Sequence, residues 1–154
     1  MRSRIWGFGL ALIVGTAGAQ PANRAKGTFD IKMTPASEAE KATLASGRFT
    51  SDKKFQGDLV GTSKGEMWTV ETSVKGSAGY VAIEKVSGTL RGRTGGFTLL
   101  HHGTMARGGD YKLTLVVVPD SGTGELAGIG GRMSITITDG KHFYEFEYTL
   151  PEKP

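Results

Sequence analysis

Two adjacent histidines, His101 and His102, are the side chains in this sequence best suited to acid–base chemistry or metal binding, and they lie in the run GGFTLLHHGTMARGG. The run is typical of a β-strand, in which successive side chains point to opposite faces. The two imidazoles are therefore poorly placed to share one ion. The chain also contains no cysteine and no H-E-x-x-H or His-x-His pattern. We predict no metal site and no bound cofactor.

Covalent catalysis and phosphate binding also lack their usual sequence patterns. Ser51 and Lys54 spell S-x-x-K, but an odd offset on a strand puts them on opposite faces, and the companion motifs are missing. The glycine-rich runs GTSKG and GTGELAG fit neither phosphate-binding fingerprint, and neither precedes a predicted helix. We interpret these runs as turns.

Three polar side chains share strand faces with large apolar residues, and they are the candidate catalytic residues: Glu66, Glu84 and His101. If the apolar residues face the core, these three must face it too. Burial and mutual pairing shift pKa values, so such a pair could move a proton or orient a substrate carbonyl. The alternative is a buried polar network that only fixes the strand register. The candidate ligand-binding residues are the aromatic side chains Trp68, Tyr80, Phe97, Tyr144 and Tyr148.

The elements that position these residues are predicted to be strands. The chain has 24 glycines among 154 residues, and short runs rich in Val, Ile, Thr, Phe and Tyr separate them. Related motifs beginning at Gly57 and Gly88, with weaker copies at Gly124 and Gly27, suggest four two-stranded units. We expect one short helix at Ser37 to Leu44. The predicted strands are roughly 26–34, 46–59, 65–74, 79–91, 96–106, 110–119, 131–138 and 141–150.

Eight antiparallel strands in one all-β domain can close into a barrel, and a sandwich is the competing arrangement. In three strands, alternation gives a clear inner face of apolar and aromatic residues. These are Phe29, Ile31 and Met33; Met133, Ile135 and Ile137; and Tyr144, Phe146, Tyr148 and Leu150. The opposite faces of the middle strands carry further apolar residues, which predict a subunit interface: Val81, Ile83, Leu100 and Val116.

Residues 1–19 are typical of a secretory signal peptide. Arg2 and Arg4 precede an apolar run, and Ala17-Gly18-Ala19 resembles a cleavage site. The apolar run is too short to span a bilayer, so we expect no membrane span after cleavage. Export predicts a periplasmic or secreted protein whose residues 20–154 form a single β-barrel domain. Losing Arg2 and Arg4 lowers the formal net charge from +4 to +2, and no basic patch favours nucleic acid.

Several long motifs in fixed order resemble an uncharacterised bacterial domain family of unknown function. They are FQGDLVGTSKGEM, KGSAGYVAIEKVSGTLRGRTGGFTLLHHGTM, VVPDSGTGELAGIGG and DGKHFYEFEYTL, and the resemblance runs from about Gly27 to Leu150. It implies a closed eight-stranded antiparallel barrel of the allene oxide cyclase-like (calycin-like) type. It also implies a homodimer or higher homo-oligomer. It implies no established activity and assigns no catalytic residue.

The leading hypothesis is a barrel that binds a small apolar ligand in its lumen. The first alternative is a cyclase or isomerase on a small apolar substrate, in which Glu66, Glu84 and His101 steer charge, by analogy with allene oxide cyclase. The second is a structural or interaction protein that uses the apolar outer face. Whether the lumen is open or filled decides between these hypotheses.

Overall fold

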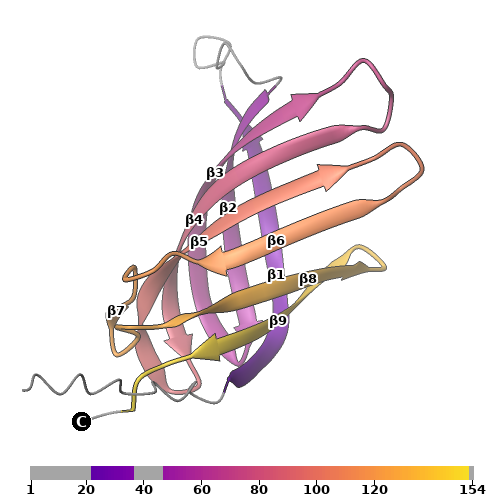
Figure 1. Ribbon diagram of the computed structural model, residues 1–154. Helices are drawn as coiled ribbons and strands as arrows, with labels where there is room; N and C mark the ends of the chain where they lie inside the picture. The colour runs from indigo at the N-terminus through magenta and orange to yellow at the C-terminus, as the bar shows by residue number, and fades with distance from the viewer. Residues whose placement is uncertain (1–21, 37–46, 153–154) are drawn as a thin grey trace, which may run out of the picture.

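The computed structural model describes residues 22–36 and 47–152, and within them the chain is all-β (Figure 1). The predicted helix at Ser37 to Leu44 and the predicted signal peptide lie outside the described residues. Nine strands follow in order: β1 Asn23–Pro35, β2 Gly47–Gly57, β3 Leu59–Glu71, β4 Ala78–Leu90, β5 Arg93–Met105, β6 Tyr111–Val117, β7 Thr123–Gly124, β8 Gly130–Thr138 and β9 Lys141–Thr149.

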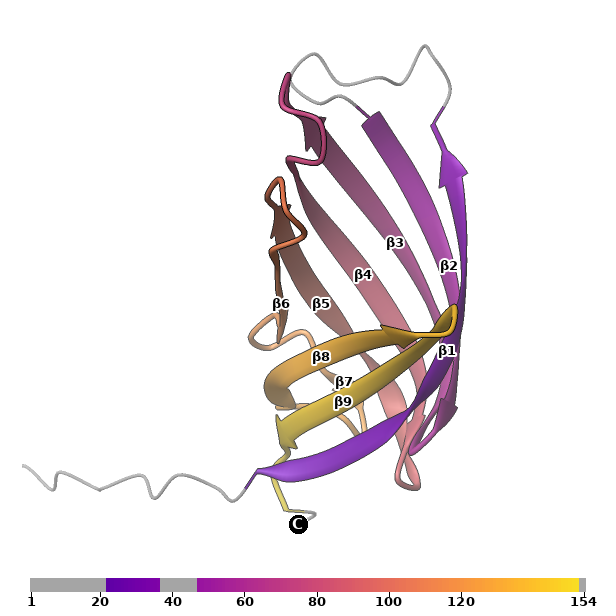
Figure 2. The same ribbon diagram turned by 90° about the vertical axis from the view of Figure 1, so that its right-hand side faces the viewer.

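Eight of these strands form the predicted closed barrel. The hydrogen-bonded order β4-β3-β2-β1-β9-β8-β6-β5 returns to its start through the β4–β5 pairing, and every pair is antiparallel. The two-residue strand β7 pairs with β5 beside the ring. The long strands β1 to β5 extend well beyond the shorter hairpin of β8 and β9 (Figure 2). The fold prediction is therefore confirmed, and the sandwich is excluded.

Two tight hairpin turns show why this sequence needs its glycines. Arg91-Gly92 and Asp139-Gly140 each have positive φ at both residues, as a type I′ turn requires. The flanking residues pair directly, Leu90 with Arg93 and Thr138 with Lys141. The hairpin predicted at Asp139-Gly140 is thus confirmed.

The turn predicted at GTSKG is wrong, because that run lies inside strand β3. The chain turns earlier, at Gly57 with a φ of 106°, where the Lys26 N–H donates to Asp58 Oδ2 over 2.9 Å. Gly61 instead allows β3 and β4 to lie close together, because a Cβ at this position would lie 2.3 Å from the Ser87 carbonyl oxygen. A glycine run alone does not distinguish a turn from such an approach.

The hydrophobic core occupies one end of the barrel. Phe97 stacks on Phe146 with ring centroids 5.5 Å apart, and Phe146 contacts Tyr148 at 5.2 Å. Leu59 and Leu90, the leucines of the two related glycine motifs, are direct cross-strand partners and fully buried here. Side chains at this end fill the interior, as expected for a barrel of eight strands.

Candidate functional site

A cavity of about 730 Å³ occupies the other end of the barrel interior. Along β4 the inward side chains Tyr80, Ala82 and Glu84 line this cavity, and the next inward residues, Val86 and Leu90, belong to the core. Glu84 therefore lies where open space gives way to packed side chains. The cavity walls are mostly apolar, and they include Ile31, Phe49, Met67, Ala82, Met105, Leu113 and Ile135.

A buried ionic cluster forms the inner end of the cavity. Lys53 Nζ donates to Glu84 Oε2 over 2.6 Å, and the Ser63 hydroxyl donates to Glu84 Oε1. His101 Nε2 lies 2.9 Å from the same Oε2. The exposed fractions of Lys53, Glu84 and His101 are 8%, 2% and 5%. Buried charges are costly unless paired, and here each charge has a partner within contact distance.

The His101–Glu84 contact is short but poorly aligned. Nε2 has no hydrogen-bond partner within the described part of the chain, because the direction of the ring N–H misses Glu84 Oε2. The pair is therefore a close contact rather than a well-aligned hydrogen bond.

Glu84 is ionised at any ordinary pH. Burial raises its pKa, but the contact with His101 and the positive charge of Lys53 outweigh burial and lower the pKa to about 2. The cluster thus carries a permanent carboxylate whose charge Lys53 balances. A permanently ionised carboxylate accepts hydrogen bonds, and it is a poor general acid at neutral pH.

A pair of tyrosines, Tyr80 and Tyr111, also lines the cavity. The Tyr80 ring lies against Gly103, where a Cβ would come within 2.4 Å of ring atom Cε1. Tyr111 Oη donates to Tyr80 Oη over 3.4 Å. Burial, together with the Tyr111 contact, raises the pKa of Tyr80 above its ordinary value, so the Tyr80 hydroxyl stays protonated.

Comparison with known proteins identifies the family. A family described as "Protein of unknown function (DUF3224)" matches residues 25–148. The chain is a member of the DUF3224 family. It is also similar to the crystal structure of a protein with unknown function from this family from Shewanella oneidensis MR-1. That chain is 47% identical, with a TM-score of 0.76, and the match covers 85% of this chain and 99% of that one. No curated protein matches the chain.

Two of the predicted site residues of this DUF3224 protein, Glu66 and Trp68, lie outside the barrel, so their predicted inward orientation is wrong. Glu66 Oε2 accepts from Arg48 Nη2 over 2.9 Å on the outer surface, and Trp68 is 39% exposed with Arg48 over its ring. The inner face of β3 carries Ser63, Gly65, Met67 and Thr69 instead. Trp68 and Val70 resembled an inner face because both are large apolar residues, although they lie on the exposed face of this strand.

Three predicted ligand-binding residues, Phe97, Tyr144 and Tyr148, do point inward, but they pack in the core and do not line the cavity. Tyr144 Oη accepts the Leu59 N–H over 2.8 Å, which fixes this ring in the closed end. Strand alternation predicts the face of a residue but not its depth along the barrel axis. These three residues therefore lie outside the cavity lining, whereas Tyr80, Glu84 and His101 line the cavity.

The buried ionic cluster of this DUF3224 protein contains two residues that sequence reasoning missed, Lys53 and Ser63. Strand alternation could have placed Lys53 inside the barrel. Lys53 shares one face of its strand with Phe49 and Phe55, whereas the opposite face is polar, with Thr50, Asp52 and Lys54. Lys53 Nζ also lies 4.8 Å from the centroid of the Phe29 ring, a distance typical of a cation–π contact. Ser63 carried no such signal.

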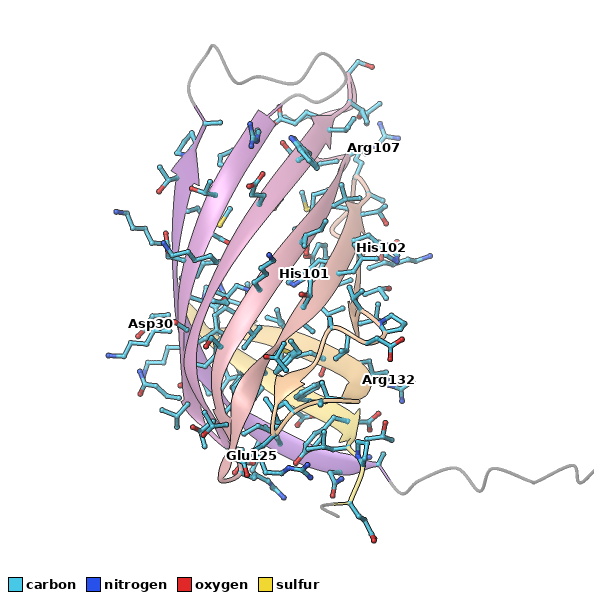
Figure 3. All side chains as sticks on the ribbon, turned by 90° about the vertical axis from the view of Figure 1, so that its left-hand side faces the viewer. Asp30, His101, His102, Arg107, Glu125 and Arg132 are labelled. Atoms are coloured by element: carbon cyan, nitrogen blue, oxygen red, sulfur yellow. The ribbon has the colours of Figure 1, made fainter. Side chains whose placement is uncertain are left out.

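The outer face of the DUF3224 barrel separates the two histidines as predicted. His102 is exposed on the side of β5 opposite His101, and Asp30 and Arg132 also extend from the outer surface (Figure 3).

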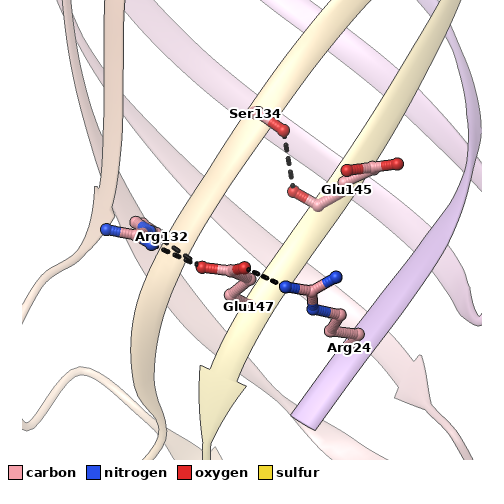
Figure 4. A network of polar contacts seen from close by, with 5 residues as sticks. All are labelled: Arg24, Arg132, Ser134, Glu145 and Glu147. Carbon is pink, nitrogen blue, oxygen red and sulfur yellow. Dashed lines mark hydrogen bonds and ion pairs between the residues drawn. The ribbon is translucent and has the colours of Figure 1, made fainter. Parts of the chain in front are cut away.

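An ionic network on the outer surface joins β8, β9 and β1. Glu147 accepts hydrogen bonds from Arg132 over 2.7 Å and from Arg24 over 3.0 Å (Figure 4). Arg132 and Arg24 hold the pKa of Glu147 below its ordinary value. These contacts are exposed, so they contribute little to stability.

The predicted apolar residues of the outer face are exposed: Val81, Ile83, Leu100 and Val116. Ile83 pairs with Leu100 across β4 and β5, and Leu100 pairs with Val116 across β5 and β6. They form one continuous stripe.

Within the described residues, no group of three or more His, Cys, Asp or Glu could hold a metal ion, and no helix is long and apolar enough to cross a membrane.

Proposed function

We propose that this protein binds a small, largely apolar molecule inside its barrel. The observation that supports the proposal is the cavity of about 730 Å³, which lies within the range of roughly 300–1,000 Å³ typical of small-molecule sites. Its walls are mostly apolar, and three of its polar side chains, Lys53, Glu84 and His101, converge at one end. Such sites commonly combine apolar area for affinity with a few polar groups that fix orientation.

Blocking the cavity tests this function. Ala82 faces the cavity and Val81 faces solvent from the neighbouring position of β4, so Ala82→Phe and Val81→Phe form a matched pair. Native mass spectrometry of protein purified from the periplasm of its own host should detect a retained small molecule in the natural chain and in Val81→Phe. Ala82→Phe should lose it. Equal retention in the two variants would show that the ligand lies elsewhere.

A second candidate function is a cyclase or isomerase, and the contact between His101 Nε2 and Glu84 Oε2 favours it. An imidazole and a carboxylate at the inner end of an apolar cavity can position a reactive group and stabilise charge that develops there. The analogy with allene oxide cyclase suggests an epoxide or polyene substrate. Incubation with such a substrate tests the idea. Turnover that His101→Leu abolishes and His102→Leu preserves would support it, and absence of turnover would remove it.

Two further proposals concern where and how the protein works. We propose export, with cleavage of the chain before Gln20, on the strength of the signal-peptide pattern in residues 1–19. Amino-terminal sequencing of the mature protein checks this cleavage. We also propose a homodimer or higher homo-oligomer through the stripe of Val81, Ile83, Leu100 and Val116, since continuous exposed apolar area commonly marks an interface.

A further inference from the structure

The open end of the barrel carries exposed apolar side chains that belong to the cavity wall. Met105 ends β5 and Tyr111 begins β6, and both line the cavity although 43% and 54% of these residues are exposed. Met33, near the end of β1, also lines the cavity and is exposed. At this end the apolar lining of the cavity is therefore continuous with the outer surface.

Further apolar side chains lie around the same end. Val74 is exposed in the turn between β3 and β4, and Trp68 and Val70 are exposed on the outer face of β3 just before that turn. The β3–β4 turn adjoins the β5–β6 turn, since the Arg107 N–H donates to Ser77 Oγ over 3.0 Å. The two turns thus form one surface beside the cavity.

Basic side chains accompany these apolar residues. Lys75, Arg107 and Lys112 each lie within two residues of an exposed apolar residue in the chain, and all three are exposed. Arg107 is at the open end of the barrel, and Glu125 is at the opposite end (Figure 3). The two turns, residues 71–78 and 105–112, carry three basic and two acidic residues, which gives a net charge of +1.

This combination of residues fits a lipid surface. Trp and Tyr side chains are favoured at the boundary between lipid headgroups and acyl chains, and Lys and Arg are attracted to anionic headgroups. The apolar side chains surround an opening instead of forming a flat patch. Fluid lipid can contact such a ring without blocking it, and apolar molecules concentrate in the acyl region of a membrane.

We propose that the open end of the barrel docks on an anionic phospholipid surface. The exposed apolar side chains of the two turns enter the interface, and the three basic side chains contact lipid phosphates. The cavity then faces the acyl region, from which its apolar ligand enters. This entry step rests on the proposed ligand-binding function, whereas docking itself requires no bound ligand.

Vesicle co-sedimentation tests the docking. Protein purified from its own host is mixed with vesicles of phosphatidylcholine alone, or of phosphatidylcholine and phosphatidylglycerol in equal amounts, at low and high salt. We expect about fivefold tighter binding to the mixed vesicles at low salt, as a net charge of +1 at an anionic surface allows. High salt should remove this preference, because salt screens exposed charges.

A matched pair of variants locates the docking surface. Val74 and Val60 are both exposed, but Val60 lies at the closed end, next to the paired Leu59 and Leu90. Val74→Glu should weaken binding to both kinds of vesicle by about tenfold, because a carboxylate replaces an apolar side chain in the interface. Val60→Glu adds the same charge and should leave binding unchanged. Residues 1–19, where they remain attached, contribute equally to both variants.

A second variant separates charge from apolar contact. The double variant Lys75→Gln/Arg107→Gln should lose the preference for phosphatidylglycerol and keep its binding to phosphatidylcholine. The urea midpoint of each variant confirms that it is folded. Equal binding of the natural protein to the two kinds of vesicle would overturn the proposed anionic surface.

The outcomes distinguish this inference from the function on which its entry step rests. Absence of vesicle binding, or equal weakening by Val74→Glu and Val60→Glu, would overturn the inference, and a copurified molecule would still support the proposed function. Vesicle binding by a protein that retains no small molecule would support docking and count against the proposed function. A change of molecular mass in Val74→Glu without any vesicle binding would assign this end to a second copy of the chain and overturn the inference.

Discussion

Lys53 Nζ and Glu84 Oε2 lie 2.6 Å apart inside the barrel, with 8% and 2% of the respective residues exposed. The two residues come from β2 and β4, which do not pair with each other, and β3 runs between them. The ion pair therefore links alternate strands through the barrel interior, and Ser63 of β3 completes the link through Glu84 Oε1. This arrangement makes the cluster both a structural tie and the polar end of the cavity.

Removing one partner of this pair should destabilise the protein far more than removing both. Glu84→Gln leaves the Lys53 ammonium buried without its counter-charge, and we expect a loss of roughly 3–5 kcal/mol in the free energy of unfolding. The double variant Lys53→Met/Glu84→Gln should recover much of that loss. Urea unfolding of Glu84→Gln, Lys53→Met and the double variant gives the coupling energy. Lys54 is an exposed neighbour, and Lys54→Met should change the free energy of unfolding by less than about 0.5 kcal/mol. Equal losses from Lys53→Met and Lys54→Met would contradict the buried ion pair.

Stability should fall on acidification through Glu84. Its pKa is about 2 in the folded protein and 4.5 ordinarily, so the folded state favours the ionised form. The contribution is complete above about pH 5 and is lost as the pH falls toward 2, for a total of about 3 kcal/mol. Urea unfolding at several pH values measures the slope. The variant Lys53→Met/Glu84→Gln should show a shallower slope in this window; an unchanged slope would assign the acid sensitivity to other carboxylates.

Gly61 should not tolerate a side chain. A Cβ at this position would lie 2.3 Å from the Ser87 oxygen and 2.7 Å from the Gly88 Cα, both backbone atoms of the paired strand β4. We expect Gly61→Ala to destabilise the barrel by roughly 1–3 kcal/mol, because β3 and β4 must separate locally. Thr62→Ala, on the outer face, serves as the control and should have a small effect. Thermal unfolding measures both, and equal midpoints would show that the strands relax freely.

A charge in the apolar outer stripe should dissociate the proposed oligomer. Ile83 is half exposed and lies between Glu66 and Leu100 on the neighbouring strands. Ile83→Glu should therefore shift the protein to monomers in light scattering coupled to gel filtration, because burying a carboxylate in an apolar contact is costly. Lys32→Glu on β1, four places from β5 around the barrel, should leave the mass unchanged. A natural chain that is already monomeric at high concentration would rule out the interface.

The sequence by itself determined the fold class and the faces of most strands. Glycine-separated runs of β-formers predicted eight strands, and alternation put Glu84 and His101 inside and His102 outside, because a strand places successive side chains on opposite faces. Asp139-Gly140 specified its own hairpin, since the turn geometry is local. These features depend on neighbours in the chain, which a single sequence displays.

The tertiary structure decided the rest. Alternation did not reveal that Trp68 and Val70 lie on the outer face of β3, so Glu66 and Trp68 were placed on the wrong side. Depth along the barrel axis depends on strand stagger, which put Phe97, Tyr144 and Tyr148 in the core and Tyr80 beside the cavity. Only the closed barrel brings Lys53 to Glu84, because their contact joins residues 31 positions apart on strands that are not neighbours. The position of a residue in the ring is set by the pairing of all eight strands together, and no local pattern encodes it.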